Sequence, residues 1–185
     1  MRSLLIVLAD QLDRASAGFD DFDPERDAVW MAEVAQESTH VWSSQQRIAV
    51  FLSAMRHFRD EQRALGRTVL YRELAPTEGP GEPTSLAQAL ARDVLTHRPE
   101  RMIVVEPGDW RVRAALSSAA AEVAVPFEIR LDRHHLCQVE EFAAHAQGRK
   151  QLRMEHFYRW MRRRHRVLMD GDGPVGGTWN LDSEN

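Results

Sequence analysis

The sequence has very little cysteine. Cys137 is the only one among 185 residues, which excludes a disulfide within the chain. It also excludes an iron–sulfur cluster or a structural zinc site made from several cysteines of this chain. His134 and His135 are the only adjacent histidines and no H-E-x-x-H pattern occurs, so we expect no metal site.

Long apolar runs are missing as well. No stretch approaches the roughly 18 apolar residues of a membrane span, and the short apolar run at residues 4–8 is too short for the core of a signal peptide. We therefore expect no membrane contact and a cytoplasmic location. The composition, with 43% hydrophobic and 28% charged residues, is that of a globular protein.

Positive charge is scarce over residues 1–148, which carry 16 Lys and Arg against 23 Asp and Glu. Residues 149–166 reverse this balance with eight cations and one acid, and residues 167–185 carry four acids and no cation. Aromatic and aliphatic residues interleave with the cations, so a helix here would have one apolar face. Such a segment favours packing on another domain or subunit, and contact with nucleic-acid phosphates is the alternative.

Short apolar strands alternate with amphipathic helices in the first 130 residues. We expect strands at residues 4–8, 28–34, 68–74, 101–105 and 126–130, and helices at residues 44–66, 85–97 and 111–123. This order predicts an α/β fold with a doubly wound, Rossmann-like, mainly parallel five-stranded sheet. In the second helix we expect Leu86, Leu90, Val94 and Leu95 to face inward. Prolines and glycines predict a surface loop at residues 75–83.

The rest of the sequence is less regular. A short helix at residues 140–147 and a longer one at residues 150–168 form an expected helical linker segment, followed by a tail without regular structure. We therefore divide the chain into an α/β domain at residues 1–135 and linker helices with a tail at residues 136–185.

Acidic and amide side chains gather where three of the expected strands end. They are Asp10, Gln11, Glu33, Glu37, Glu106 and Asp109. In a doubly wound sheet these strand ends are neighbours, and ligands bind beside them. The pattern predicts a pocket lined by carboxylates and an amide, although any one of these acids could instead cap a helix or face water.

The turn after the first strand has no glycine before Gly18, and its two carboxylates would repel a phosphate. A G-x-G-x-x-G match at residues 171–176 follows a helix rather than a strand and contains Pro174, so we do not read it as a nucleotide motif. No P-loop or G-x-S-x-G elbow occurs, and we expect no catalytic residue in this chain. The pocket favours a neutral ligand with N–H and hydroxyl donors.

Six segments carry a resemblance to one protein family. They are LADQL (residues 8–12), MAEVAQES (31–38), FLSAMRHF (51–58), EPGDWRVR (106–113), GRKQLRMEHFYRWMRRR (148–164) and VLMDGDGPVGGTWNLDSEN (167–185). The chain resembles the N-terminal part of prokaryotic iron–sulfur photolyases and cryptochromes, also called deoxyribodipyrimidine photolyase-related proteins, which include bacterial (6-4) photolyases. The resemblance extends over essentially the whole chain.

The resemblance implies a light-harvesting antenna domain of a flavoprotein lyase for DNA repair, with 6,7-dimethyl-8-ribityllumazine as its pigment. FAD and a [4Fe–4S] cluster would belong to a C-terminal catalytic domain that this chain lacks, so the chain alone should be inactive. Its partners would be that domain and, through the full-length protein, UV-damaged DNA; the isolated domain can also self-associate. The alternatives are a cryptochrome-type blue-light photoreceptor and a free-standing α/β small-molecule-binding module.

The resemblance also places the pigment ring near residues 8–11, 33–37 and 106–110. The expected pigment-binding residues are Leu8, Ala9, Asp10, Gln11, Glu33, Val34, Glu37, Glu106 and Trp110. Hydrogen bonds would come from Glu37, Asp10, Gln11 and Glu33, and Trp110 would form an apolar wall. Ala9 departs from the glycine that is commoner in the family, and its methyl group can crowd the pigment.

Overall fold

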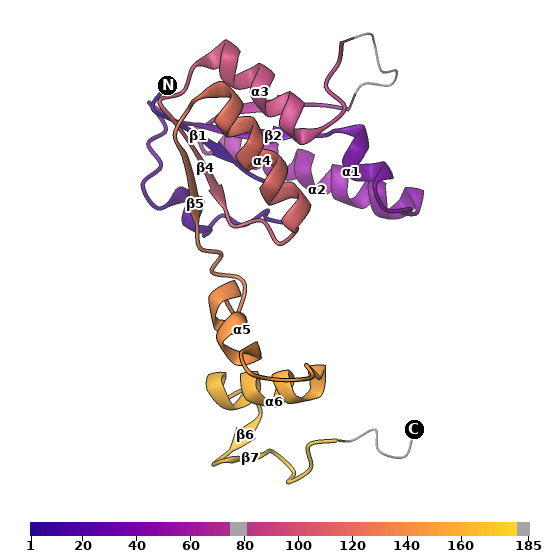
Figure 1. Cartoon of the computed structure of the whole chain (residues 1–185). Helices are drawn as coiled ribbons and strands as arrows, with labels where there is room; N and C mark the ends of the chain where they lie inside the picture. Colours follow the sequence, from indigo (N-terminus) through magenta and orange to yellow (C-terminus); the bar gives the residue numbers. More distant parts are fainter. Residues whose placement is uncertain (75–80, 181–185) are drawn as a thin grey trace. The chain divides into compact units, whose positions relative to one another are not determined.

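The computed structural model describes residues 1–74 and 81–180 (Figure 1). The chain forms two compact units, Met1–Arg133 and His134–Asn185. Most of the loop predicted at residues 75–83, and the end of the tail, lie outside the described residues.

The first unit contains a five-stranded parallel sheet. Its strands are β1 (Ser3–Ile6), β2 (Ala28–Ala32), β3 (Thr68–Arg72), β4 (Arg101–Val105) and β5 (Phe127–Arg130), in the order β3-β2-β1-β4-β5. The predicted doubly wound α/β fold is confirmed. After β1, the chain places β2 and β3 on one side of this strand. It then crosses back and places β4 and β5 on the other side. The carboxyl end of β1 is therefore the switch point at which such sheets bind ligands.

Helices connect the strands, and polar side chains cap three of them. The helical elements are η1 (Ala17–Phe19, a 3₁₀ turn), α1 (Ala35–Thr39), α2 (Gln45–Ala64), α3 (Leu86–His97) and α4 (Trp110–Val123). In the first turns of α2, α3 and α4, backbone N–H groups donate hydrogen bonds to the side chains of Ser44, Ser85 and Asp109, respectively. The short helix α1 lies between the strand predicted at residues 28–34 and the helix predicted at residues 44–66, where no element was predicted.

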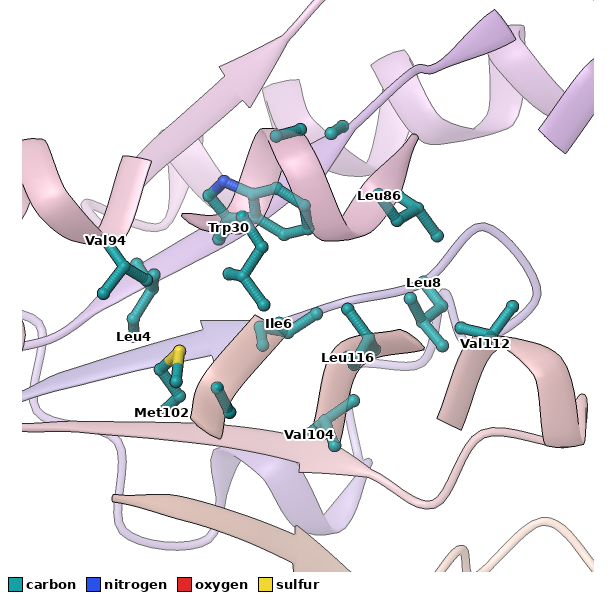
Figure 2. Packing of buried hydrophobic residues seen from close by; sticks show 14 of the residues in the cluster. Leu4, Ile6, Leu8, Trp30, Leu86, Val94, Met102, Val104, Val112 and Leu116 are labelled. Carbon is teal, nitrogen blue, oxygen red and sulfur yellow. The ribbon is translucent and has the colours of Figure 1, made fainter. Parts of the chain in front are cut away.

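The two faces of the sheet carry separate hydrophobic cores. Helices α3 and α4 cover the face to which Leu4, Ile6 and Leu8 point (Figure 2). Helix α2 covers the opposite face, where Leu5 and Val7 lie. Consecutive side chains of a strand point to opposite faces, so the unbroken apolar run of residues 4–8 supplies both cores.

Helix α3 corrects one detail of the predicted core. Leu86, Leu90 and Val94 are buried against the sheet, as their four-residue spacing predicts. Leu95 is 66% exposed, so its predicted inward orientation is wrong. It follows Val94 by one residue, and a helix turns about 100° per residue, which carries the side chain toward solvent.

The second unit contains α5 (Val139–Ala146), α6 (Met154–His165) and a two-stranded antiparallel hairpin of β6 (Met169–Asp170) and β7 (Gly173–Pro174). Both predicted helices are confirmed, although α6 is shorter than the predicted 150–168. The expectation of a tail without regular structure is wrong for residues 169–174, because Gly171 adopts a positive φ of 56° and closes the hairpin turn.

Candidate functional site

A cavity of about 360 Å³ lies at the carboxyl ends of β1 and β2, beside the segment that follows β4. Its apolar lining comes from Val7, Leu8, Ala9, Ala32, Val34, Val41, Ile48, Phe51, Leu52, Met55, Leu86, Pro107 and Val112. Its polar lining comes from Asp10, Glu33, Glu37, Ser38, His40, Ser43, Arg47, Asp109 and Arg111. The volume is in the range of about 300–1,000 Å³ that is usual for small-molecule sites.

The structure brings together six of the nine residues predicted to bind the pigment. Leu8, Ala9, Asp10, Glu33, Val34 and Glu37 line the cavity. They come from the ends of β1 and β2 and from α1, because the parallel strands end at the same edge of the sheet.

Glu33 lines this cavity, but protein groups already surround its carboxylate. Arg56 donates to Oε1 and Oε2 at 2.7 and 2.8 Å, the Tyr71 hydroxyl donates to Oε1 at 2.5 Å, and the Leu74 N–H donates to Oε2 at 2.9 Å. Burial opposes the charge of Glu33, but these hydrogen bonds outweigh burial and lower its pKa. Burial and the neighbouring carboxylate raise the pKa of Tyr71, which keeps its hydroxyl protonated. The geometry makes Glu33 a support for the cavity wall rather than a free ligand group.

Glu37 forms a two-point ion pair across the cavity rim. Arg111, in the first turn of α4, donates from Nη1 and Nη2 to its two carboxylate oxygens at 2.9 and 3.0 Å. The side chains of Glu37 and Arg111 are 34% and 29% exposed. A carboxylate offers about four acceptor positions, so Glu37 keeps acceptor capacity for a further donor.

Asp10 and Arg47 are the charged groups on the rim that remain available. Among residues 1–74 and 81–180, neither side chain has an ion-pair partner. The Arg47 guanidinium lies 5.6 Å from the centre of the Phe51 ring. Four carboxylates and two guanidinium groups line the cavity, which disfavours an anionic ligand such as a phosphate.

Three predicted residues do not line this cavity. The Gln11 amide donates to the carbonyl oxygens of Val105 and Glu106 at 3.2 and 2.9 Å, so it ties the turn after β1 to the end of β4. The Glu106 carboxylate pairs with Arg113 at 3.1 Å. Trp110 is 76% exposed at the start of α4, and the apolar wall assigned to it is supplied by residues such as Val112 and Phe51.

The chain matches the deoxyribodipyrimidine photo-lyase-related protein family over residues 5–185. It belongs to this family. A (6-4) photolyase from Agrobacterium fabrum (strain C58 / ATCC 33970) is 41% identical over all 185 residues of this chain. The alignment covers 36% of that photolyase, so the chain spans about a third of the length of its curated relative.

The EPGDWRVR segment of this photolyase-related chain contributes five of its eight residues to the cavity. Pro107, Gly108, Asp109, Arg111 and Val112 line it, whereas Glu106, Trp110 and Arg113 do not. The turn after β4 and the first turn of α4 determine which of these residues reach the cavity, because a helix directs only part of its circumference to one side. No helix within the described residues is long and apolar enough to cross a membrane. The cytoplasmic location stays a prediction.

Sequence reasoning missed the contribution of α2 to the cavity. The apolar stripe of this helix predicts core positions for Ile48 and Phe51, yet Phe51 is 39% exposed and both residues line the cavity. Further along the same stripe, Met55 and Phe58 are buried in the core, so the stripe is shared between the cavity and the core. The helical spacing of the apolar residues is the same in both parts, so the sequence carries no signal that separates the cavity wall from the core.

Proposed function

We propose that this chain is the antenna domain of a DNA photolyase and that its cavity holds 6,7-dimethyl-8-ribityllumazine. The observation that carries the proposal is the mainly apolar cavity at the switch point of the sheet, with carboxylates on its rim. Membership of the photolyase-related family and the match to a third of a (6-4) photolyase support the same proposal.

The lining is chemically matched to this pigment. Val34, Ile48 and Phe51 line the cavity, and aliphatic and aromatic side chains of this kind can pack against a flat bicyclic ring. A ribityl chain carries several hydroxyl groups, for which Asp10, Ser38, His40, Ser43 and Arg47 supply donors and acceptors. The pigment has no phosphate, in keeping with the excess of carboxylates.

Each charged residue has a separate proposed role. Glu37 accepts a hydrogen bond from the N–H at the pyrimidine-like edge of the ring. Asp10 accepts hydrogen bonds from hydroxyl groups of the ribityl chain. Glu33, held by Arg56, stabilises the wall from behind. When bound, the pigment absorbs violet light and transfers the excitation to a flavin. We propose that FAD and a [4Fe–4S] cluster belong to the part of the polypeptide that corresponds to the rest of the relative.

Repair of (6-4) photoproducts would take place in that other part, and this chain would be inactive on DNA by itself. A cryptochrome-type photoreceptor would place the same demands on this cavity. The proposed partners are therefore the catalytic part of the polypeptide and, through it, UV-damaged DNA.

Fluorescence titration of the 185-residue chain with the ribityllumazine tests the proposal. We expect saturable binding that weakens about tenfold or more in Glu37→Ala, because a hydrogen bond to a charged group contributes about 1.5–3 kcal/mol. Glu73→Gln is the matched control, because Glu73 pairs with Arg59 and does not line the cavity. Absence of binding by folded protein would reject the pigment site, and equal affinity of Glu37→Ala would reject the role of Glu37.

A further inference from the structure

Among the described residues, few contacts hold the part of the cavity wall that α1 forms. Helix α1 has five residues, none of them buried, and the Val34 N-cap provides no side-chain hydrogen bond. A single helical turn is not stable alone, because nucleation costs more than one turn of hydrogen bonds returns. One backbone hydrogen bond, from Gln36 N–H to the Thr84 carbonyl oxygen at 3.1 Å, joins α1 to the start of α3. The orientation of the Glu37 side chain therefore depends on its contact with Arg111.

Arg111 is itself held from a second direction. The Asp109 carboxylate caps α4 by accepting the Arg111 backbone N–H at 2.7 Å and lies 3.4 Å from Arg111 Nη2. The Arg111 guanidinium thus contacts both Asp109, which caps its own helix, and Glu37 on α1, and it links the β4 side of the cavity to the β2 side. Arg111 Nε is buried and has no hydrogen-bond partner among the described residues. An unpaired buried donor is unfavourable, and the contacts of Arg111 with Glu37 and Asp109 offset this cost.

We propose that Arg111 is the positioning residue of the ligand site, which holds the Glu37 carboxylate in the orientation that accepts a ligand N–H. This inference rests on the proposed pigment site. Planar guanidinium groups bind both oxygens of a carboxylate in one plane, so the pairing fixes the rotation of the carboxylate as well as its position. The free acceptor positions of Glu37 are then directed before the ligand arrives, and less conformational freedom is lost when it binds.

A double-mutant cycle on the 185-residue chain tests this role. The dissociation constant of the ribityllumazine is measured by fluorescence for the unmodified chain, Arg111→Gln, Glu37→Ala and the double variant. We expect Arg111→Gln to raise the dissociation constant about tenfold. In the Glu37→Ala background the same substitution should change it by less than about twofold, because Arg111 then has no carboxylate to position. Arg111→Lys retains the charge but not the planar two-point contact. Its dissociation constant should lie between those of the unmodified chain and Arg111→Gln.

Arg113→Gln is the matched control. Arg113 lies on the same helix, pairs with an acid at 3.1 Å and does not line the cavity, so its removal should leave the affinity within about twofold. Thermal unfolding of each variant separates positioning from stability. The Glu37–Arg111 pair is about one-third exposed, so the unfolding midpoint of Arg111→Gln should stay close to that of the unmodified chain.

The outcomes distinguish this inference from the proposed function. Unchanged or tighter binding by Arg111→Gln, with normal binding by the unmodified chain, overturns the positioning role and leaves the pigment site in place. Equal losses in both backgrounds overturn it as well, because they would show that Arg111 acts independently of Glu37. No binding by the folded, unmodified chain overturns both proposals.

Discussion

Arg56 holds the buried carboxylate of Glu33 through two parallel hydrogen bonds, at 2.7 and 2.8 Å. The Glu33 side chain is 0% exposed, whereas that of Arg56 is 43% exposed. A charge at the end of a buried strand would be unstable without such a partner. The pair therefore explains how the polar end of β2 can adjoin the hydrophobic core.

Replacing Arg56 with glutamine should destabilise the fold, because it leaves the Glu33 charge without its main partner. Breaking a buried pair usually costs about 3–5 kcal/mol. Arg56 is partly exposed, and Tyr71 and Leu74 still donate to Glu33, so we expect a loss of about 2–3 kcal/mol in the free energy of unfolding. Urea unfolding measures this loss. Arg14→Gln removes a cation that is 73% exposed and should change stability little; equal effects of the two variants would contradict the argument.

The free energy of unfolding should fall in acid partly because of Glu33. Hydrogen bonds from Arg56, Leu74 and Tyr71 outweigh burial and hold the pKa of Glu33 in the folded protein below its ordinary value of 4.5. The unfolded chain therefore takes up the proton first as the pH falls. The contribution of Glu33 is complete above about pH 4.5 and is lost as the pH falls through the pKa of the folded state, with a slope of at most about 1.4 kcal/mol per pH unit.

Urea unfolding between about pH 3 and pH 7 should show this dependence, and Glu33→Gln should weaken it. Asp27 should account for part of the remainder. Burial opposes its charge, but hydrogen bonds led by those from Arg2 lower its pKa in the same direction. A Glu33→Gln variant with the acid dependence of the unmodified chain would show that the Arg56 contact contributes nothing to it.

Gly18 is packed too closely against β1 to accept a side chain. A Cβ atom at this position would lie 2.6 Å from Leu5 Cδ1, and Leu5 is 2% exposed in the core beneath α2. We expect Gly18→Ala to cost about 1–3 kcal/mol through overpacking. Leu5→Val removes the clashing atom, so the double variant should lose less stability than the sum of the single variants. Additive losses in thermal unfolding would show that the contact is not the cause.

The basic helix α6 should bind duplex DNA only weakly. Several of its arginines already have partners within the second unit: Arg159 pairs with Glu155, Arg164 with Glu141, and Arg162 donates to the Val167 carbonyl oxygen at 3.1 Å. The remaining cations are exposed and few, so any affinity should fall steeply between about 50 and about 200 mM salt. Fluorescence anisotropy with a labelled duplex measures this, and tight binding that resists salt would show that α6 is a dedicated DNA surface.

The fold was largely predictable because its signals are local. Apolar runs of four or five residues indicate strands buried on both faces, and Ser44 and Ser85 mark helix starts through hydrogen bonds to nearby N–H groups. The rule for strand order then places the site at the end of β1. Helix α1 was missed because it is short and has no buried residue, so it leaves no periodic apolar pattern.

The sequence by itself determined the parallel sheet, the capped helices and the edge where Asp10, Glu33 and Glu37 meet. Only the tertiary structure decided what each of these acids can do. Arg56 lies 23 residues from Glu33, and Arg111 lies 74 residues from Glu37, so neither pairing has a local signal. A carboxylate whose hydrogen-bond acceptor positions are all used, such as that of Glu33, supports the cavity wall. A carboxylate with unused acceptor positions, such as that of Glu37, can hold a ligand. That difference arises from which distant side chains the packed elements bring within hydrogen-bond distance.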